Sequence, residues 1–201
     1  MKKLLEALSI KHFLSFLLMQ VIAITAFNQQ IKYHTKDDLN LLVSGTSTLH
    51  NWDMKGAKGE VNAIFTFNPT GQISAINALT FTTAANGIKS EHSAMDKNAY
   101  KALKIDLNPN ITFVLTAGSV TAIDANSYTV RCIGKLTIAG INKDVEEVIA
   151  VCRVNADKSI SVSGTKKISM KDYGMIPPSF MFGTVKTGND VQLKFDLTIR
   201  N

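Results

Sequence analysis

The chain has 201 residues, of which 45% are hydrophobic and 19% are charged. This composition predicts one folded domain, or at most two, and excludes an intrinsically disordered chain. The formal charge is +6, yet the densest basic cluster is only Lys166, Lys167 and Lys171, with no aromatic residues interleaved. Nucleic-acid binding is therefore not expected.

Residues 1–26 have the order of a secretory signal peptide. Lys2, Lys3 and Lys11 accompany an apolar run over residues 13–27, and small residues lie at its end. The run of about 15 residues is shorter than the roughly 20 that a membrane span needs, so a retained anchor is the weaker alternative. We predict cleavage near Ala26 and one exported domain, residues 27–201, that is periplasmic or secreted.

Apolar and polar residues alternate through most of the remaining chain. The alternation covers residues 61–67, 73–81, 111–116, 128–138, 148–154, 160–170 and 191–199. A period of two is typical of strands with one buried face, and residues 68–71 (Asn-Pro-Thr-Gly) supply a turn. Many such strands at short spacing predict an antiparallel barrel or sandwich.

One segment has a helical period instead. Met95, Ala99, Ala102 and Leu103 are spaced as on one face of a helix over residues 93–104. Ser93 with Asp96 three residues later predicts a capping box at its start. We expect this amphipathic helix to cover an opening or a sheet edge.

The two cysteines lie on two successive predicted strands, Cys132 in residues 128–138 and Cys152 in residues 148–154, and each is on the apolar face of its strand. A turn around residues 140–143 would place Cys132 opposite Cys152, where the Cβ atoms of a cross-strand pair are about 4.5–5.5 Å apart. The same register would place Arg131 opposite Arg153. A disulfide and two buried thiols both stay open from the sequence.

The segment 45–54 (GTSTLHNWDM) gathers hydroxyl groups, His50, Trp52 and Asp53. If it is extended, His50 and Trp52 share one face and Asp53 lies on the other, so Asp53 does not orient His50. The remaining histidines show no metal-ligand spacing. We expect neither a catalytic constellation nor a metal site, and we interpret the segment as a bent barrel strand whose His50 and Trp52 could line a wall.

The segment 174–183 (GMIPPSFMFG) is a loop by its prolines and glycines but is rich in apolar residues. Such a loop either plugs a barrel end or lines a ligand entrance. A barrel of about eight strands can hold one small ligand.

Several segments, in this order, resemble the YceI-like family of lipid-binding proteins, in the variant common in secreted bacterial members. They are GTSTLHNWDMKGAKGEV at 45–61, IKSEHSAMDKNAYKALK at 88–104 with NPNITFVL at 108–115, GKLTIAGINKDVEEV at 134–148, and ISVSGTKKISMKDYGMIPP at 160–178. The resemblance covers about residues 33–201. It implies a lipocalin-like antiparallel barrel with an elongated apolar tunnel for a polyisoprenoid or similar chain, such as a quinone tail. It also implies export and, often, a homodimer.

The leading hypothesis is therefore an exported protein that binds or carries an isoprenoid-type lipid without a cofactor, in transient contact with a membrane during lipid exchange. The alternatives are a small-molecule enzyme that uses the same cavity with His50 as acid or base, and a structural or interaction protein whose barrel is filled. The residues expected to contact the ligand are His50, Trp52, Phe65, Phe67, Phe81, Met95, Leu103, Phe113, Leu115, Leu136, Phe180, Phe182 and Phe195.

Overall fold

The computed structural model describes residues 28–36 and 38–201. The predicted signal peptide, residues 1–26, lies outside this part of the chain. Within it, twelve strands, one α-helix and three 3-10 turns follow one another. Their bounds are β1 Gln29–Lys36, β2 Leu39–Ser47, β3 Trp52–Gly56, β4 Glu60–Phe67, β5 Ile73–Ala84, η1 Ala85–Gly87, β6 Ile88–Lys89, α2 Ser93–Leu103, β7 Asn110–Ala122, β8 Ser127–Ile138, β9 Ile141–Val154, β10 Ile160–Ser169, η2 Met170–Tyr173, β11 Ser179–Phe180, η3 Met181–Gly183 and β12 Val185–Ile199.

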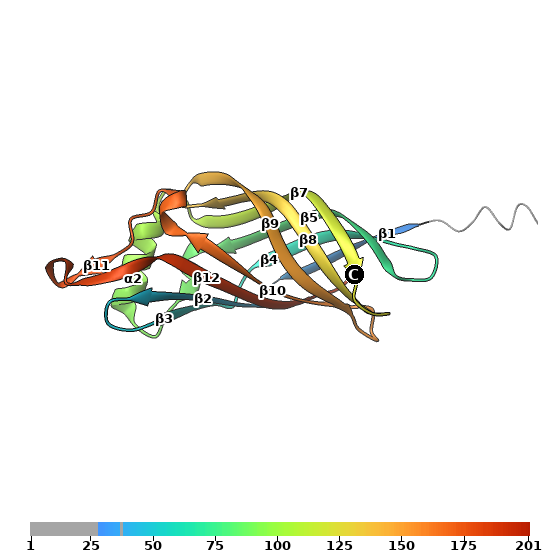
Figure 1. Ribbon diagram of the computed structural model, residues 1–201, viewed down its shortest axis with the longest axis horizontal. Coiled ribbons are helices and arrows are strands. Elements are labelled where there is room, and N and C mark those ends of the chain that lie inside the picture. The colour runs from blue at the N-terminus through green and yellow to red at the C-terminus, as the bar shows by residue number, and fades with distance from the viewer. Residues whose placement is uncertain (1–27, 37) are drawn as a thin grey trace, which may run out of the picture.

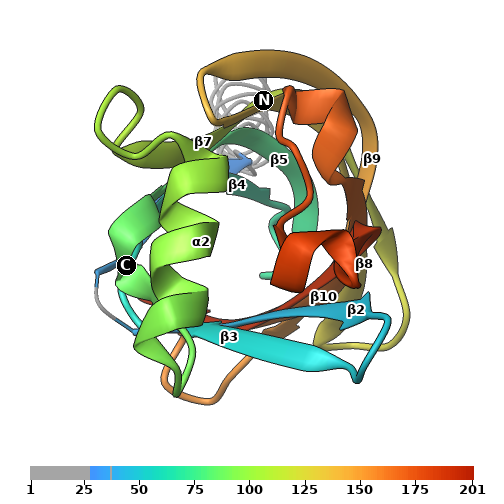
Figure 2. The same ribbon diagram turned by 90° about the vertical axis from the view of Figure 1, so that its left-hand side faces the viewer.

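All pairings in the sheet are antiparallel, and the strand order is β1-β4-β5-β7-β8-β9-β10-β12-β2-β3-β6, with β11 beside β12. Figure 1 shows the long axis of this curled sheet, and Figure 2 looks along it into the barrel. The predicted all-β barrel with one short helix is confirmed. It has more strands than the eight or so expected because β1 was not predicted, the strand predicted at residues 45–54 is divided between β2 and β3, and β6 and β11, with two residues each, are too short to show an alternation.

The sheet closes on itself in two places. At one end of the barrel, His34 and Arg200 exchange backbone hydrogen bonds of 2.7 and 2.9 Å, which join β1 to the end of β12. At the other end, β6 follows β5 through η1 and pairs with β3. The Thr83 hydroxyl also donates to the Lys58 carbonyl oxygen across this junction, at 2.7 Å.

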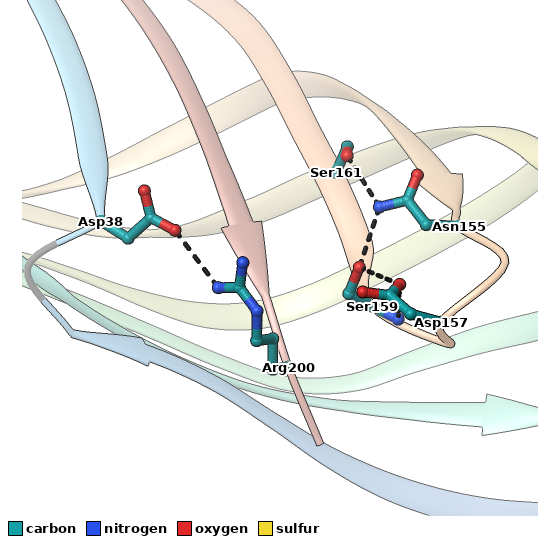
Figure 3. Close-up of polar contacts among 6 residues, drawn as sticks. All are labelled: Asp38, Asn155, Asp157, Ser159, Ser161 and Arg200. Atoms are coloured by element: carbon teal, nitrogen blue, oxygen red, sulfur yellow. Dashed lines mark hydrogen bonds and ion pairs between the residues drawn. The ribbon is translucent and has the colours of Figure 1, made fainter.

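The first of these ends, called the closed end below, is filled by side chains and tied by polar contacts. Tyr33, Phe67, Ile73, Tyr128 and Ile160 are all buried there. Figure 3 shows polar contacts at this end, among them the ion pair between Arg200 and Asp38. In the β9–β10 turn, the Asn155 amide donates to the hydroxyl oxygens of Ser159 and Ser161.

The opposite end, called the mouth below, is formed by the β2–β3 loop (residues 48–51), α2, and the segment from η2 to η3 (residues 170–183). In Figure 2, α2 crosses one side of the barrel opening and the η2–η3 segment lies on the other side. The helix starts at Ser93 as its period predicts and ends at Leu103, one residue before the predicted end. None of the helices in the described part of the chain combines the length and hydrophobicity that crossing a membrane requires.

The predicted capping box at Ser93 is wrong. The N-cap of α2 is His92, and no side chain caps it. The Asp96 carboxylate instead accepts hydrogen bonds from Ser90, which precedes the helix: from its amide at 2.7 Å and from its hydroxyl at 2.8 Å. The carboxylate therefore ties the chain before the helix to its first turn, and these hydrogen bonds, the amide bond first, lower the pKa of Asp96.

The predicted register of β8 and β9 is also wrong. Ala139 and Gly140, both at positive φ, make a two-residue turn of the kind favoured in hairpins. Cys132 consequently pairs with Val148, and Cys152 with Tyr128. Arg131 does not face Arg153 but forms an ion pair with Glu147.

Both cysteines are buried free thiols. An offset of four residues is about 13 Å along a strand, beyond the roughly 7 Å that a disulfide can join between Cα atoms. Burial raises the pKa of Cys132 to about 11 and that of Cys152 to about 12.

Candidate functional site

A cavity of about 640 Å³ extends from the mouth into the barrel. Its walls are the inward faces of the strands, because the alternation of each strand turns every second side chain inward. Phe65 lies on β4, Phe81 on β5, Phe113 on β7 and Phe195 on β12, and all four line the cavity. An apolar space of this size falls within the range of small-molecule sites, roughly 300–1,000 Å³.

The helix forms one side of the mouth. Met95, Ala99 and Leu103 are partly buried against the core and line the cavity. The helix has no fully buried residue, so its apolar face borders the cavity and does not sit within the core. The expected role of α2, covering an opening of the barrel, matches this position.

The segment from Gly174 to Gly183 divides between the wall and solvent. Met175 is buried and Phe180 lies at the surface, and both line the cavity together with Pro178. Ile176 and Phe182 point into solvent. The segment therefore borders the entrance and does not plug the barrel.

The expectation of one bent strand over residues 45–54 is wrong. β2 ends at Ser47 and β3 begins at Trp52, so the segment is a hairpin. The Ser47 hydroxyl oxygen accepts from the amides of Leu49 and His50, both at 3.2 Å, and stabilises the turn. Gly45 then pairs with Trp52, and Ser44 with Asp53.

His50 and Trp52 both line the cavity near the mouth. The Trp52 indole donates to the Thr46 carbonyl oxygen at 3.0 Å, which leaves its apolar ring for the wall. The Nδ1 atom of His50 lies 2.7 Å from the Asn51 carbonyl oxygen, and Asp53 is exposed on the next strand. Asp53 is therefore not the residue that orients His50, as the alternation predicts.

Ten of the thirteen predicted contact residues border the cavity. They are His50, Trp52, Phe65, Phe81, Met95, Leu103, Phe113, Leu136, Phe180 and Phe195. The other three do not. Phe67 packs on Tyr33 at the closed end, with ring centroids 6.2 Å apart. Leu115 precedes a bulge in the β7–β8 pairing, and Phe182 is fully exposed.

Sequence reasoning missed several wall residues. Leu41, Val43 and Met54 line the cavity from β2 and β3, and the spacing of two between apolar Leu39, Leu41 and Val43 was a usable signal for β2. Ile76 also lines it, but the bulges between β4 and β5 shift the inward face there. No alternation could have revealed this shift.

Among the described residues that line the cavity, Lys166 is the one Lys, Arg, Asp or Glu side chain. It lies on β10 just beyond Thr165, the last residue that pairs with β9. Its ammonium group donates to the Glu147 carbonyl oxygen at 2.6 Å, across the gap where the two strands separate. Among the described residues, no buried side-chain nitrogen or oxygen lacks a hydrogen-bond partner, so the wall offers a ligand little beyond apolar contact.

The described residues include no group of three or more His, Cys, Asp or Glu side chains arranged to hold a metal ion. His34 takes part in the backbone bridge at the closed end, and His92 occupies the N-cap position of α2 at the mouth without a capping hydrogen bond from its side chain.

Fold and cavity together define a lipocalin-like protein, an antiparallel sheet curled around one apolar cavity that opens at one end. A family model described as the YceI-like domain matches residues 30–199. The chain therefore belongs to the YceI-like family, as its motifs suggest. No curated protein matches it significantly.

Solved structures show the same fold at low sequence identity. A polyisoprenoid-binding domain from Saccharophagus degradans, implicated in plant cell wall breakdown, matches with a TM-score of 0.61 and 10% identity, covering 86% of this chain and 99% of that one. BcnA from Burkholderia cenocepacia matches with a TM-score of 0.58 and 18% identity, covering 80% and 96%. The YCEI protein of Campylobacter jejuni gives 0.52 and 21%, covering 72% and 85%.

Proposed function

We propose that this protein is an exported carrier that holds a long-chain, isoprenoid-type lipid in its barrel cavity. The single observation that carries the proposal is the cavity of about 640 Å³, with walls that are almost wholly apolar and open at the mouth. The membership in the YceI-like family and the likeness to a polyisoprenoid-binding domain support it.

Burial of the lipid chain would drive binding, at about 25 cal/mol for each Å² of apolar surface removed from water, less the cost of ordering. The distribution of polar residues along the cavity wall indicates where the polar head of such a lipid would lie. Ser47, His50, His92, Asn98 and Thr187 border the mouth, whereas the deeper wall is almost entirely apolar. The chain would therefore enter first and leave its head group at the mouth.

The two alternatives have less support. A filled barrel does not fit a cavity of this volume. For an enzyme with His50 as acid or base, no described carboxylate hydrogen-bonds to the ring, whose recorded partner is the Asn51 carbonyl oxygen.

Native purification from the exporting host, organic extraction and mass spectrometry test the proposal. We expect a stoichiometric long-chain lipid. A protein that is empty as isolated, and that also fails to take up an added quinone or polyprenol, would contradict it. The cell fraction in which the protein is recovered tests export separately.

A further inference from the structure

The large apolar side chains that are most exposed gather at the mouth. Leu49, Leu107, Ile176 and Phe182 are 69%, 83%, 84% and 113% exposed, the highest values among the large hydrophobic residues of the described chain. Leu49 lies in the β2–β3 loop, and Ile176 and Phe182 flank β11. Leu107 follows α2, next to Asn108, which touches the β8–β9 turn at Gly140. These four residues are called the apolar tips below.

Figure 1 shows α2, β11 and the β2–β3 connection together at one extremity of the barrel. At the closed end, the only comparable side chain in the described chain is Ile123, which is 57% exposed. Phe182 also has φ 56° and ψ 32°, a backbone conformation that bulky residues rarely adopt. Its ring gains no burial within the described chain in return for this conformation.

The apolar tips continue into the cavity. Leu49 both projects into solvent and lines the cavity, as does Phe180, which is 36% exposed. Met175, directly before Ile176, is buried in the wall. An apolar surface therefore runs from outside the molecule into the barrel, and a lipid chain could follow it without crossing water.

Basic side chains outnumber acidic ones around the apolar tips. The exposed lysines of the mouth and its flanking segments are Lys89, Lys97, Lys101, Lys104, Lys171 and Lys186, and the exposed acidic residues are Asp53, Glu91, Asp106 and Asp172. None of these side chains takes part in the ion pairs recorded for the described residues. Lysines in this setting complement the phosphate groups of anionic lipids.

We propose that the mouth docks on the surface of a lipid bilayer that contains anionic phospholipids. The apolar tips insert at the boundary between head groups and acyl chains, and the lysines contact the phosphates. This inference rests on the proposed function, since it describes how a lipid cargo enters and leaves. A second copy of the chain fits less well, because the tips lie on three separate connections around an opening.

Flotation of the purified full-length mature protein with vesicles tests the inference. The vesicles are phosphatidylcholine alone or phosphatidylcholine mixed with phosphatidylglycerol. We expect the protein to float with the mixed vesicles. The double substitution Ile176→Ser with Phe182→Ser should weaken binding by at least about tenfold, because both side chains lose their burial in the membrane. Ile123→Ser, equally apolar but at the closed end, should leave binding unchanged.

Charge is tested with Lys101→Glu combined with Lys104→Glu. We expect binding to the mixed vesicles to fall by about tenfold and binding to phosphatidylcholine alone to change little. All these positions are exposed, and a denaturation curve for each variant confirms that it is folded.

The inference is overturned if the wild-type protein does not float with either vesicle, or if the double tip variant floats as well as the wild type. Light scattering tests whether a second copy of the chain occupies the mouth instead. A wild-type dimer that dissociates in the double tip variant, together with no vesicle binding, would assign the mouth to that second copy. The lipid extracted from the same preparations reports the proposed function separately. Vesicle binding by a protein that neither contains a lipid nor takes up an added quinone or polyprenol would contradict the carrier function and leave the membrane contact standing.

Discussion

The indole ring of Trp52 lies against the backbone of Gly45, its paired residue across β2 and β3. A Cβ atom on Gly45 would overlap three carbons of the ring. The ring thus occupies the space that a side chain would fill, and its N–H donates to the neighbouring Thr46 carbonyl oxygen. This contact fixes one wall of the cavity near the mouth.

Gly45→Ala should lower the free energy of unfolding by about 1–3 kcal/mol, because the new methyl group forces the indole out of its place. Trp52 is the only tryptophan in the chain, so its fluorescence emission should shift in the same variant. Gly87→Ala is the matched control, since a Cβ there meets nothing within 4 Å. Wild-type stability and emission in Gly45→Ala would refute the prediction.

Ala150→Phe should block the cavity. Ala150 is buried and lines the cavity from β9, so a phenyl ring there would occupy the space that a ligand needs. We expect the lipid recovered per protein to fall by at least about tenfold, given about 0.8 kcal/mol for each CH₂ group that loses its burial.

Val151→Phe adds a ring on the outward side of the same strand, where Val151 is exposed, and should leave the lipid content unchanged. Equal lipid content in both variants would place the ligand outside the barrel.

Asp96→Ala should loosen the helix that covers the mouth, because the Ser90 amide loses its acceptor and the Ser90 hydroxyl keeps only the His92 carbonyl oxygen. We expect faster amide hydrogen exchange in α2 and faster lipid release. Ser93→Ala should change neither, since no side chain caps the helix N-terminus. If Ser93→Ala loosened the helix as much as Asp96→Ala, the capping box predicted from the sequence would be correct after all.

The hydrogen bonds from Ser90 to the Asp96 carboxylate also predict that the stability of α2 depends on pH. The pKa of Asp96 is lower in the folded protein than its usual value of 3.8. Its support of α2 is therefore complete above pH 3.8 and is lost as the pH falls through the lowered pKa. Above pH 3.8, amide hydrogen exchange in α2 should be slower in the wild type than in Asp96→Asn. Below the lowered pKa of Asp96, the two proteins should exchange at the same rate.

The buried thiols predict the opposite pH dependence. Their pKa values rise from the usual 9.0 to about 11 for Cys132 and about 12 for Cys152. Above pH 9 the unfolded chain releases these protons while the folded chain keeps them, so stability falls as the pH rises. The slope should be at most about 1.4 kcal/mol per pH unit for each thiol.

Replacing both cysteines with alanine should flatten the decline in stability between pH 9 and 11, measured by denaturant unfolding under reducing conditions. Thiol reagents at pH 8 should react with the wild-type protein only after denaturation. Rapid reaction of the folded protein, or the same pH slope in the double variant, would show that the thiols are not held neutral by burial.

The sequence by itself determined which residues face inward along the regular parts of the strands. Val61, Ala63 and Phe65 on β4, and Val191 and Leu197 on β12, lie on the inner side of the barrel as their alternation predicts. The helix over 93–103 follows from its own period in the same way. These assignments succeed because side-chain direction in a strand or helix is a local property of the backbone.

Only the tertiary structure decided how the strands are aligned and at what depth each inward residue lies. The two-residue turn at Ala139 and Gly140 and the bulge between Cys132 and Gly134 separate the two cysteines. Phe65 and Phe67 share one face of β4, yet Phe65 lines the cavity and Phe67 packs on Tyr33 at the closed end. Alternation specifies the face of a strand, but depth in a barrel depends on turns, bulges and the relative shift of neighbouring strands, which involve residues far apart in the chain.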